Sequence, residues 1–439
     1  MKEIRLVLLG FGSANRALAK ILLEKSEQDD YSSPSSSCRR CLRVSTSGTT
    51  TLVSWKVVCI ITRRHGRACV PCAATSEINL QEALGRMNSG VELDNTLVVT
   101  NTRATFNDTN TTPTINTTAI DAESTEETIK LLKDLGETQT ANILVEAIPS
   151  NPKSNGEPAI SFIRTALQAG MHVASANKCP LSHKNSDRND GETYFELQKI
   201  AKNSRKLYLH ESAVMDGVPV FSLWNTLPCV RCTKIRGLFN STTTLILSRM
   251  EGNIDKVVEG DGQIEHHGET FDEAFQAAKQ MGIVEEDESL DIDGYDAAMK
   301  LRALCVFLGS LSEEYDLIIP PLEAIPRDTI RRIDTDRIYD EFGMSRKKMR
   351  SVASAELFDV SSDPANGLHR PVKTWKMCVK NEFLSPSDTL YNMKGTSSSV
   401  QFYTDTMGPI TIVSTDPTLK DTAYGLFSDI VRIASQSLY

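Results

Sequence analysis

No stretch of this 439-residue chain is apolar for long enough to cross a lipid bilayer. Positive charge is not in excess either, because 48 lysines and arginines stand against 57 aspartates and glutamates and leave a formal charge of -9. The chain therefore has no general attraction for nucleic acid or anionic membranes. Room for a signal or transit peptide is also missing, since an apolar strand is predicted from Ile4 onward. We expect a cytoplasmic protein that is long enough to bury an ample core.

Large apolar residues are scarce in two polar stretches, residues 29–50 and 101–118. Neither stretch has enough apolar surface to form packed core. We interpret both as mobile surface insertions and predict neither helix nor strand within them.

Ten cysteines are present, and six of them form the CxxC pairs Cys38/Cys41, Cys69/Cys72 and Cys229/Cys232. Four thiolates from the first two pairs are a standard set for structural zinc. A whole predicted strand separates those two pairs, however, and no glycine of a metal knuckle lies between the paired thiols, so zinc is disfavoured. Reduced thiols are the expectation, with Cys59 and Cys305 in the core.

The amino-terminal segment MKEIRLVLLGFGSANRALAKILLE combines an apolar strand, a glycine turn and a helix. The strand is predicted over Ile4 to Leu9, and helical spacing runs from Arg16 to Leu23. Gly10 suits the tight turn, and Gly12 lets the backbone approach a pyrophosphate that the helix N-terminus can bind. The cofactor-binding residues expected here are Gly10, Gly12, Ser13 and Ala14.

The third glycine of a dinucleotide fingerprint is absent, because Asn15 stands in its place. The replacement weakens a pattern that is already short and common. Its position directly after an amino-terminal strand still favours dinucleotide binding over a purely structural turn.

An acid is missing from the end of the second predicted strand, Trp55 to Thr62, where NAD-selective sites usually hold the ribose 2'-hydroxyl. Arg63 and Arg64 follow the strand instead, and guanidinium groups suit a 2'-phosphate. We therefore expect NADP to be preferred over NAD. The alternative is a solvated basic turn.

Three more apolar strands are predicted, over residues 141–148, 171–176 and 207–209. In open α/β sheets, ligands bind beyond the carboxyl ends of the strands. The residues that follow the first two of these strands are therefore further candidates for cofactor binding: Ser150, Asn151, Asn177 and Lys178. A lysine in such a position is also common on ordinary surfaces.

The segment from Gly282 to Leu304, GIVEEDESLDIDGYDAAMKLRAL, is rich in carboxylates. Asp296 and Lys300 are four residues apart in a run of helix formers, so both side chains project from one face of a predicted helix. Taken alone, they are an ordinary ion pair worth about 0.3 to 0.5 kcal/mol. The other interpretation is a hydride-transfer site, in which a lysine with a lowered pKa takes the proton of an alcohol.

Several long motifs resemble the homoserine dehydrogenase family, over nearly the whole chain outside the two polar stretches. In order, they are GFGxxNRALA, VEAIPSNPxxxGEPA, AGMHVASANKCP, ESAVMDGVPVF, IRGLFNSTTTLIL, the Gly282 to Lys300 segment, LYNMKGTSSSVQFYTDTMGPITI and DTAYGLFSDIVRIA. Such a series is more specific than a glycine fingerprint. The resemblance implies the reversible oxidation of L-homoserine to L-aspartate 4-semialdehyde with NAD(P), in the biosynthesis of threonine, methionine and isoleucine.

The resemblance also implies roles for single residues. Lys300 corresponds to the lysine that transfers a proton at the substrate oxygen, and Lys178 to a second active-site lysine that is its electrostatic partner. Glu285 and Asp296 correspond to acids that hold the substrate amino group and order the site, and Asp291 is counted with them. A desolvated ammonium group needs a carboxylate partner, and Glu285 is the expected contact.

A loop that binds sodium through backbone carbonyls in many members of the family corresponds to Glu211, Val214 and Gly217. A sodium ion beside the NADP site is therefore a further expectation.

Three residues depart from the family pattern. Ser241 and Thr244 replace the glycine and the last asparagine of NGTTN, and Asp216 brings a charge close to the expected cation. Two alternatives stay open for this reason. One is a related dehydrogenase of another small amino or hydroxy acid, and the other is a non-catalytic NADP-binding regulator, which Asn15 and Ser241 would fit.

The expected fold is α/β, with a Rossmann-type nucleotide-binding domain and a mixed α+β substrate and dimerisation domain. The nucleotide-binding domain is predicted over residues 1–209 and 417–439, the substrate domain over 221–364, and a dimerisation sheet over 210–220 and 365–416. A homodimer is the expected assembly. No regulatory ACT extension is recognised.

Three further features are predicted in the carboxyl-terminal third. The basic run Arg346 to Arg350 is interpreted as a solvated helix face. Residues 385–412 are expected to join a mixed sheet. A terminal helix is predicted over residues 422–438, and it should return to the nucleotide-binding domain.

Overall fold

The computed structural model describes residues 3–28, 40–46, 49–70, 76–100, 125–184, 192–252, 268–284, 287–312, 314–360 and 371–436. The chain divides into two compact units. Unit 1 consists of Met1–Pro180, Phe195–Gly217 and Leu419–Tyr439, and unit 2 of Leu181–Tyr194 and Val218–Thr418. Each unit has a main sheet of its own. Within the described residues, no helix has the length and apolarity needed to span a membrane.

Unit 1 is built on an eight-stranded sheet in the order β10-β9-β8-β1-β4-β3-β2, with β5 paired to β4. Its strands are β1 (Glu3–Leu9), β2 (Glu27–Gln28), β3 (Arg40–Thr46), β4 (Thr49–Ile61), β5 (Arg67–Cys69), β8 (Ile143–Glu146), β9 (His172–Ser175) and β10 (Tyr208–Leu209). From β10 through β1 to β4 the strands run parallel. Every residue of β8 and β9 is buried, as expected for parallel strands covered on both faces.

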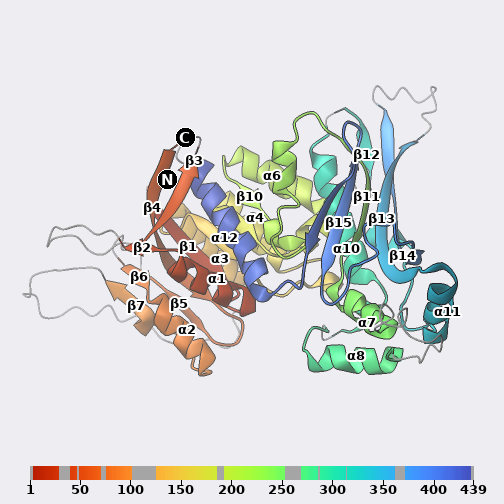
Figure 1. Ribbon diagram of the computed structural model, residues 1–439. Coiled ribbons are helices and arrows are strands. Elements are labelled where there is room, and N and C mark those ends of the chain that lie inside the picture. The colour runs from red at the N-terminus through yellow and green to blue at the C-terminus, as the bar shows by residue number, and fades with distance from the viewer. Residues whose placement is uncertain are drawn as a thin grey trace, which may run out of the picture. The chain divides into compact units, whose positions relative to one another are not determined.

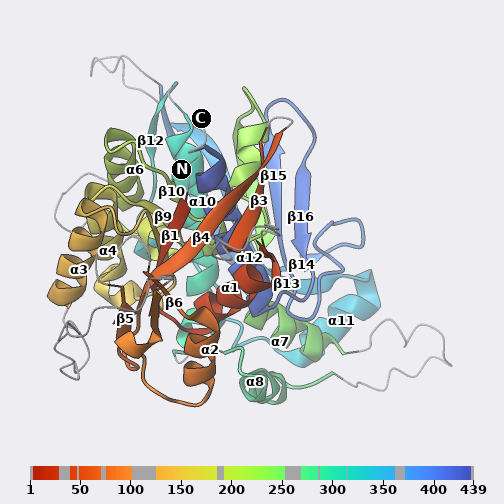
Figure 2. The same ribbon diagram turned by 90° about the vertical axis from the view of Figure 1, so that its left-hand side faces the viewer.

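Helices cover both faces of this parallel part. Figure 2 shows α3 (Thr125–Glu137) and α4 (Ala159–Gln168) on one side, and α1 (Ser13–Glu24) and α12 (Leu419–Gln436) on the other. The terminal helix α12 packs along α1. Two other helices of the chain are α5 (Cys179–Ser182) and α6 (Thr193–Asn203), which precedes β10. The arrangement confirms the predicted α/β class with a Rossmann-type domain.

The prediction that residues 29–50 contain no strand is wrong in part. β3 forms an antiparallel pair with the first half of β4. Leu42 and Val44 are buried there, because alternate residues of a strand point to the same face and two apolar residues can cover it in a polar segment. Residues 29–39 and 47–48 lie outside the described residues, as does the whole second polar stretch, 101–118.

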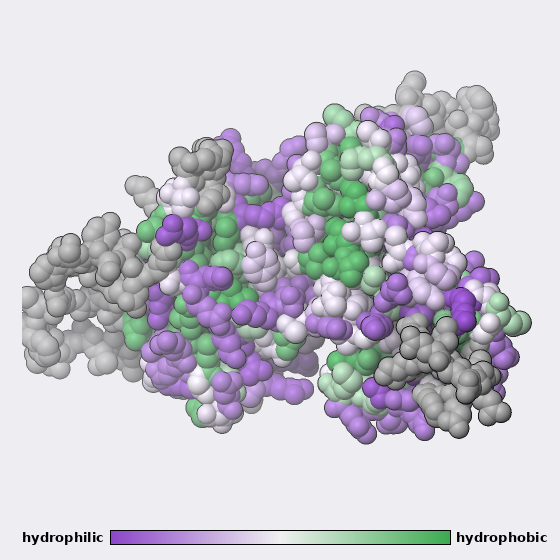
Figure 3. Space-filling view, viewed as in Figure 1, coloured by the Kyte–Doolittle hydropathy of each residue, from purple (hydrophilic) through white to green (hydrophobic). Residues whose placement is uncertain are grey.

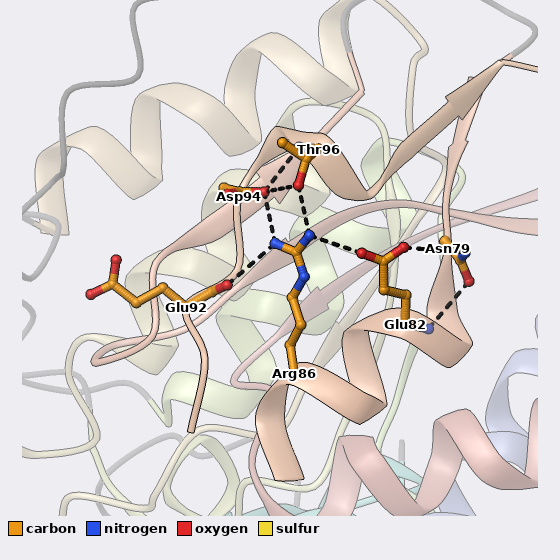
Figure 4. Close-up of polar contacts among 6 residues, drawn as sticks. All are labelled: Asn79, Glu82, Arg86, Glu92, Asp94 and Thr96. Carbon is orange, nitrogen blue, oxygen red and sulfur yellow. Dashed lines mark hydrogen bonds and ion pairs between the residues drawn. The ribbon is translucent and has the colours of Figure 1, made fainter. Parts of the chain in front are cut away.

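A smaller part of unit 1 contains α2 (Leu80–Asn88), the hairpin of β6 (Ser76–Ile78) and β7 (Val98–Thr100), and the 3-10 helix η1 (Asn95–Leu97). Arg86 on α2 connects the helix to the loop before η1 (Figure 4). Its guanidinium group donates to Glu82 and Asp94 at 2.8 Å each and to Thr96 at 2.7 Å. The hydrogen bond to Glu82, followed by that to Asp94, raises the pKa of Arg86.

Unit 2 is built on a six-stranded mixed sheet in the order β12-β14-β13-β11-β15-β16, in which only β12 and β14 pair in parallel. Its strands are β11 (Cys232–Leu238), β12 (Asp316–Ile318), β13 (Lys348–Val360), β14 (Val372–Leu384), β15 (Ser398–Thr404) and β16 (Ile410–Ser414). Helices α7 (Ser241–Glu251), α10 (Tyr295–Ser310) and α11 (Thr335–Ser345) contact β13 (Figure 1). Helix α8 (Phe271–Gln280) packs against α7.

The basic run Arg346 to Arg350 does not form the predicted solvated helix face. Lys348 and Arg350 lie on β13, both are buried, and both pair with Glu251 at the end of α7, at 2.9 and 2.7 Å. Arg350 also donates to the main-chain oxygen of Tyr391. A buried acid from a distant segment therefore pairs with both cations that the sequence pattern assigns to solvent.

Cys59 and Cys305 are buried as predicted. The expectation of reduced thiols is wrong for Cys59, which forms a disulfide bond with Cys69. The antiparallel pairing of β4 with β5 places these two residues directly opposite each other, so their side chains are close enough to bond. Cys38 and Cys72 of the CxxC pairs lie outside the described residues.

Candidate active site

Unit 2 gathers an amide, two carboxylates and a lysine near the start of two helices. Asn240 lies between β11 and α7, and Asp291 lies on the short helix α9 (Ser289–Ile292). Asp296 and Lys300 are in the first two turns of α10. We call these four residues the acid-amide-lysine cluster.

Asn240 joins the two carboxylates of the cluster. Its Nδ2 donates to Asp291 Oδ1 at 2.7 Å and to Asp296 Oδ2 at 3.1 Å. Its Oδ1 accepts the main-chain N–H of Thr243 at 2.8 Å, which caps α7. Because both ends of this buried amide are in use, the orientation of Asn240 is fixed.

Lys300 is held at Nζ by two oxygens. Asp296 Oδ2 lies 2.9 Å away, and the main-chain oxygen of Phe239 accepts a hydrogen bond of 2.8 Å. The prediction that Asp296 and Lys300 share one face of a helix is thus confirmed. An ammonium group has three N–H donors, so these two contacts leave one donor for a ligand. The Lys300 side chain is 20% exposed, whereas that of Asp296 is only 4% exposed.

The two carboxylates of the acid-amide-lysine cluster are deeply buried. Asp291 and Asp296 are each 3% exposed, and both accept hydrogen bonds from Asn240. A buried carboxylate is stable only when polar or cationic groups pair with it, and a cationic group of a ligand is one such partner.

Arg302, two residues beyond Lys300, anchors α10. It is fully buried, and its Nη2 donates to both carboxylate oxygens of Glu192 at 2.7 and 3.0 Å. Its Nε donates to the main-chain oxygen of Pro320 at 2.8 Å. These contacts fix the rotation of the helix and therefore the direction in which Lys300 leaves it.

The other predicted residues of unit 2 are placed only in part. Glu285 lies outside the described residues, so its contact with a substrate amino group stays a prediction. Ser241 and Thr244 occupy the first turn of α7. The Thr244 hydroxyl donates to the main-chain oxygen of Asn240 at 3.0 Å. The threonine that departs from the family pattern therefore has a hydrogen-bond partner at the start of the same helix.

The glycine turn after β1 has room for a phosphate. Gly10 has a φ of +81°, and a Cβ there would lie 2.7 Å from the main-chain oxygen of Ala147, so a larger residue would collide. Space is open at the Cβ position of Gly12, and no side chain caps α1. The N–H groups of Ser13 and Ala14 begin this helix without an intrahelical acceptor, which is the arrangement that binds pyrophosphate.

The side chain of Asn15 stabilises this turn through hydrogen bonds. It is fully buried, and its Nδ2 donates to the main-chain oxygens of Leu9 at 3.2 Å and Gly10 at 3.0 Å. The asparagine at the third position of the fingerprint therefore stabilises the strand-to-turn transition and leaves the open space at Gly12 intact.

Arg63 and Arg64 follow β4 at the same edge of the sheet as the glycine turn, since the Gly10 N–H donates to the oxygen of Ile61 at 2.9 Å. Both arginines are exposed, and neither has an ion pair with another described residue. The Thr62 hydroxyl shapes the loop by donating to the Gly66 oxygen at 2.8 Å. Two unpaired guanidinium groups with no acid at the strand end fit a 2'-phosphate.

Glu146 is a buried acid at the carboxyl edge of the sheet that the sequence analysis missed. It ends β8 and accepts hydrogen bonds from the Ile148 N–H at 3.0 Å, the Ser175 hydroxyl at 2.5 Å and the Asn177 amide at 3.4 Å. Complete burial raises the pKa of Glu146, against the smaller opposite effect of these bonds. The carboxyl group joins the ends of β8 and β9.

Asn177, one of the predicted cofactor residues of this edge, contacts Glu146 directly. Asn177 Oδ1 accepts from the Ser150 hydroxyl at 3.1 Å and from the Cys179 N–H at 3.0 Å. Lys178 is half-buried between these residues in the chain, and Asn151 is exposed before the 3-10 helix η2 (Pro152–Ser154). Ser150 and Asn177 are thus in direct contact.

The loop predicted to bind sodium lies in unit 1, after β10. Glu211 begins the 3-10 helix η3 (Glu211–Ala213), Val214 is fully buried, and Gly217 has a positive φ. The carboxylate of Glu211 pairs with Arg432 at 3.0 Å, and its N–H donates to Asp429 at 2.8 Å. Burial raises the pKa of Asp429 to about 8.

Asp216 has a structural partner in the same loop. Its Oδ1 accepts the hydroxyl of Thr422 at 3.2 Å, in the first turn of α12. A carboxylate is favoured near the N-terminus of a helix, so the charge of Asp216, which departs from the family pattern, has a structural explanation.

Comparison with known proteins gives a consistent family. The family model for homoserine dehydrogenase matches residues 219–431. An NAD(+)-dependent homoserine dehydrogenase of Pseudomonas canavaninivorans is 26% identical over 436 residues, which cover 99% of this chain and 97% of the relative. A homoserine dehydrogenase of Sulfurisphaera tokodaii is 27% identical over 68% of this chain and 78% of the relative. The chain is thus similar to homoserine dehydrogenases, over nearly its whole length in one of these comparisons.

Solved structures support the same fold. A putative homoserine dehydrogenase of Archaeoglobus fulgidus superposes with a TM-score of 0.64 at 19% identity, covering 98% of this chain and 99% of that one. A hyperthermophilic archaeal homoserine dehydrogenase in complex with NADPH gives a TM-score of 0.62 at 23% identity, covering 99% and 98%. The matches extend over both units, although the family model covers mainly unit 2.

Two residues of the candidate site were not identified as site residues from the sequence. Asn240 precedes a helix, where asparagine is a common N-cap residue. The signal that could have identified it is the Ser-Thr-Thr-Thr run that follows it within a matched motif. Glu146 ends an apolar run, and a charged residue at the end of a fully buried parallel strand is the corresponding signal.

Proposed function

We propose that this chain catalyses the reversible NAD(P)-dependent oxidation of L-homoserine to L-aspartate 4-semialdehyde, with NADP preferred. The observation that carries the proposal is the acid-amide-lysine cluster, in which Asp296 and the Phe239 oxygen hold Lys300 Nζ at 2.9 and 2.8 Å. A fixed proton-transfer group beside buried carboxylates is what the oxidation of an amino alcohol requires.

The carboxylates of the cluster recognise the amino group of the substrate in this proposal. Asp291 and Asp296 are buried beside Lys300, and the ammonium group of homoserine needs a carboxylate partner when it leaves water. Glu285 belongs to the same group of acids by its family position. Asn240 keeps the two described carboxylates at a fixed spacing through its Nδ2.

Lys300 transfers the proton of the reacting oxygen. In the reductive direction its Nζ donates a proton to the aldehyde oxygen, and in the oxidative direction it takes the proton of the hydroxyl group. Asp296 and the Phe239 oxygen occupy two donors of Nζ, so the third is available for the substrate. Arg302 and Glu192 keep α10 from rotating while this occurs.

The cofactor would be held by residues of unit 1. When bound, the nicotinamide supplies the group that accepts or gives the hydride. The start of α1, with Gly10, Gly12, Ser13 and Ala14, suits the pyrophosphate, and Arg63 and Arg64 suit a 2'-phosphate.

Four residues at the carboxyl ends of β8 and β9 complete the proposed cofactor site. Ser150, Asn151 and Asn177 offer hydroxyl and amide groups there, and Lys178 brings a second ammonium group to this edge. Glu146 is a positioning residue, because it accepts hydrogen bonds from Asn177 and Ser175 and is itself buried.

A sodium ion is proposed at the loop of Glu211, Val214 and Gly217, through main-chain carbonyls. The Glu211 carboxylate is occupied by Arg432, so its side chain is not needed as a ligand. Gly217 has a positive φ, and a Cβ added there would lie 2.5 Å from the main-chain oxygen of Asp421, so this turn requires glycine.

A homodimer is proposed through the six-stranded sheet, and the cytoplasm as the compartment. Figure 3 shows an apolar area over the region of this sheet, and β16 is an edge strand of it. Val413 on β16 is 41% exposed. An exposed apolar edge is commonly covered by a second subunit.

The test is an assay of the purified chain with homoserine and either NADP or NAD, followed by the absorbance of the reduced nicotinamide. Reduction of NADP with a kcat/KM at least about tenfold above that for NAD is expected, since one charge-assisted contact is worth that much. Cofactor binding without turnover of homoserine would contradict the proposed function.

A further inference from the structure

Unit 1 has a hollow at the opposite edge of its parallel sheet from the glycine turn. Its volume is about 800 Å³. The walls come from the amino ends of the strands: Arg5 is on β1, His172 begins β9, and Lys206 precedes β10. Gly136 at the end of α3 and Gly170 after α4 lie at the same edge. The cofactor residues lie at the carboxyl ends of these strands, so the hollow is separate from them.

Three cations line the hollow without an ion pair. Arg5, Arg205 and Lys206 have no carboxylate partner among the residues that the structure describes. The Nε of Arg5 is buried and has no hydrogen-bond acceptor. Burial lowers the pKa of Lys206, and no carboxylate raises it again. This density of unpaired positive charge is unexpected in a chain with a formal charge of -9.

His172 adds a neutral donor to the same wall. Its Nδ1 accepts the main-chain N–H of Leu207 at 3.1 Å, so the neutral ring carries its proton on Nε2. Burial, and then the charge of Lys206, lowers the pKa of His172 to about 4. The ring of His172 is therefore neutral near pH 7, and Lys206 is close enough to act on it.

The acidic side chain at the rim does not neutralise the hollow. Glu137 also lines the hollow, but its exposed carboxylate lies 3.8 Å from Lys133 Nζ and has no ion pair with Arg5, Arg205 or Lys206. Asn142 is occupied with the backbone, because it accepts from the Arg5 N–H and donates to the Glu3 oxygen, each at 2.8 Å. The hollow thus presents cations and an imidazole N–H, and its polar main-chain groups are satisfied.

We propose that this hollow is a binding site for a small polyanion that carries phosphate or carboxylate groups, held by Arg5, Lys206, Arg205 and the Nε2 of His172. β1 and β10 are three strand spacings apart, about 14 Å in a sheet. The long side chains of Arg5 and Lys206 extend into the hollow from these two strands, so a ligand with two or more charged groups can contact both cations. The site is distinct from the cofactor and substrate sites proposed above.

Isothermal titration of the full chain, saturated with NADPH, tests this proposal. The probes are inorganic pyrophosphate and citrate, each against sodium chloride at matched ionic strength, which separates a phosphate site from a carboxylate site and both from general screening. We expect one probe to bind with one-to-one stoichiometry. Arg5→Gln and Lys206→Gln should each weaken that binding about tenfold or more, because each removes a charge-assisted contact.

Lys202→Gln is the matched control, since Lys202 is exposed on α6 and does not line the hollow. It should change the affinity less than about twofold. Equal loss in the control, no saturable binding of either probe, or full affinity in both Arg5→Gln and Lys206→Gln would overturn the proposal. Binding that occurs only without NADPH would assign the anion to the cofactor site instead and would also overturn it.

A second measurement does not depend on the stability of the variants. The imidazole of His172 can be followed by NMR in the wild-type chain while pyrophosphate or citrate is added. An anion at Nε2 favours the charged ring, so the pKa of His172 should rise from about 4. An unchanged His172 titration at saturating probe would contradict the proposed contact.

Discussion

The acid-amide-lysine cluster of unit 2 and the glycine-turn edge of the unit 1 sheet differ in whether their polar groups already have partners within the protein. In unit 2, the amide of Asn240 and the ammonium of Lys300 already have fixed partners at 2.7 to 3.1 Å. In unit 1, α1 begins without a side-chain cap, and Arg63 and Arg64 are exposed without an ion pair among the described residues.

Under the proposed function, this difference reflects what each region binds. A proton-transfer group must be held within a fraction of an ångström, so its neighbours are supplied by the protein itself. A nucleotide brings its own negative charges, so the donors that receive it are left unsatisfied until it binds. The contrast implies that substitutions in unit 2 lower turnover, whereas those in unit 1 weaken cofactor affinity.

The largest effect is expected for Lys300→Ala. Loss of the proton-transfer group should lower kcat for homoserine about 10² to 10⁴-fold, while the dissociation constant for NADPH stays unchanged. Steady-state kinetics and fluorescence titration with NADPH measure the two quantities. Lys279→Ala removes another paired lysine of unit 2, 2.8 Å from Glu288, and should leave kcat unchanged. A similar kcat in the two variants would show that Lys300 takes no part in the reaction.

Asn240→Ala should lower kcat/KM for homoserine about a hundredfold, because Asp291 and Asp296 lose their common donor and Lys300 shifts with Asp296. The helix cap is lost as well, at about 1 kcal/mol of unfolding free energy.

Asn79→Ala is the matched control for this effect, since Asn79 caps α2 in unit 1 by accepting the Glu82 N–H at 3.2 Å. Thermal unfolding should show a similar loss of stability for both variants, with kinetics affected only at Asn240. An equal loss of activity in the two would mean that capping alone explains the result.

The double substitution Arg63→Gln with Arg64→Gln tests whether the unpaired cations of unit 1 bind the cofactor. We expect the KM for NADPH to rise about tenfold or more, because charge-assisted contacts with the 2'-phosphate are lost. The KM for NADH and the kcat should stay the same. If NADH and NADPH are affected alike, the two arginines do not distinguish the cofactors.

Glu146→Ala and Glu146→Gln separate a positioning role from a need for charge. The alanine variant leaves the Ser175, Asn177 and Ile148 donors without an acceptor and should lose about 2 kcal/mol of stability, with a severalfold rise in the KM for the cofactor. Glutamine keeps the shape and should be close to wild type, because burial raises the pKa of Glu146. Equal defects in both would show that the ionised carboxylate is required.

The smallest effect concerns pH and Asp429. The pKa of this buried acid is raised to about 8, above the usual 3.8 of an unfolded aspartate. Between these values the unfolded state loses a proton that the folded state keeps, so stability falls as the pH rises from about 4 to about 8. Relative to Asp429→Asn, the wild type should lose at least about 1 kcal/mol between pH 5 and pH 8, measured by urea unfolding. Parallel stability curves would contradict this.

Features encoded over a few neighbouring residues could be predicted from the sequence. The strand, glycine turn and helix at the amino terminus are local patterns, and so is the spacing of Asp296 and Lys300, which form the expected contact. The residues that follow β8 and β9 were identified as candidates because the carboxyl ends of parallel strands share one edge.

Contacts between distant segments could not be predicted in this way. Asn240 meets carboxylates 51 and 56 residues away, and Arg350 meets Glu251 across 99 residues. Burial of Lys348 and Arg350 depends on that acid, which no local pattern of charge reveals. The disulfide between Cys59 and Cys69 depends on the pairing of β4 with β5.

The central claim is that the acid-amide-lysine cluster holds an amino-acid substrate by its ammonium group. The most direct test compares kcat/KM for homoserine with that for 4-hydroxybutyrate, which lacks the amino group, in the wild type and in Asp291→Asn. We predict a preference for homoserine of at least about a hundredfold in the wild type, reduced about tenfold or more in the variant. Comparable values for the two substrates in the wild type would contradict the account.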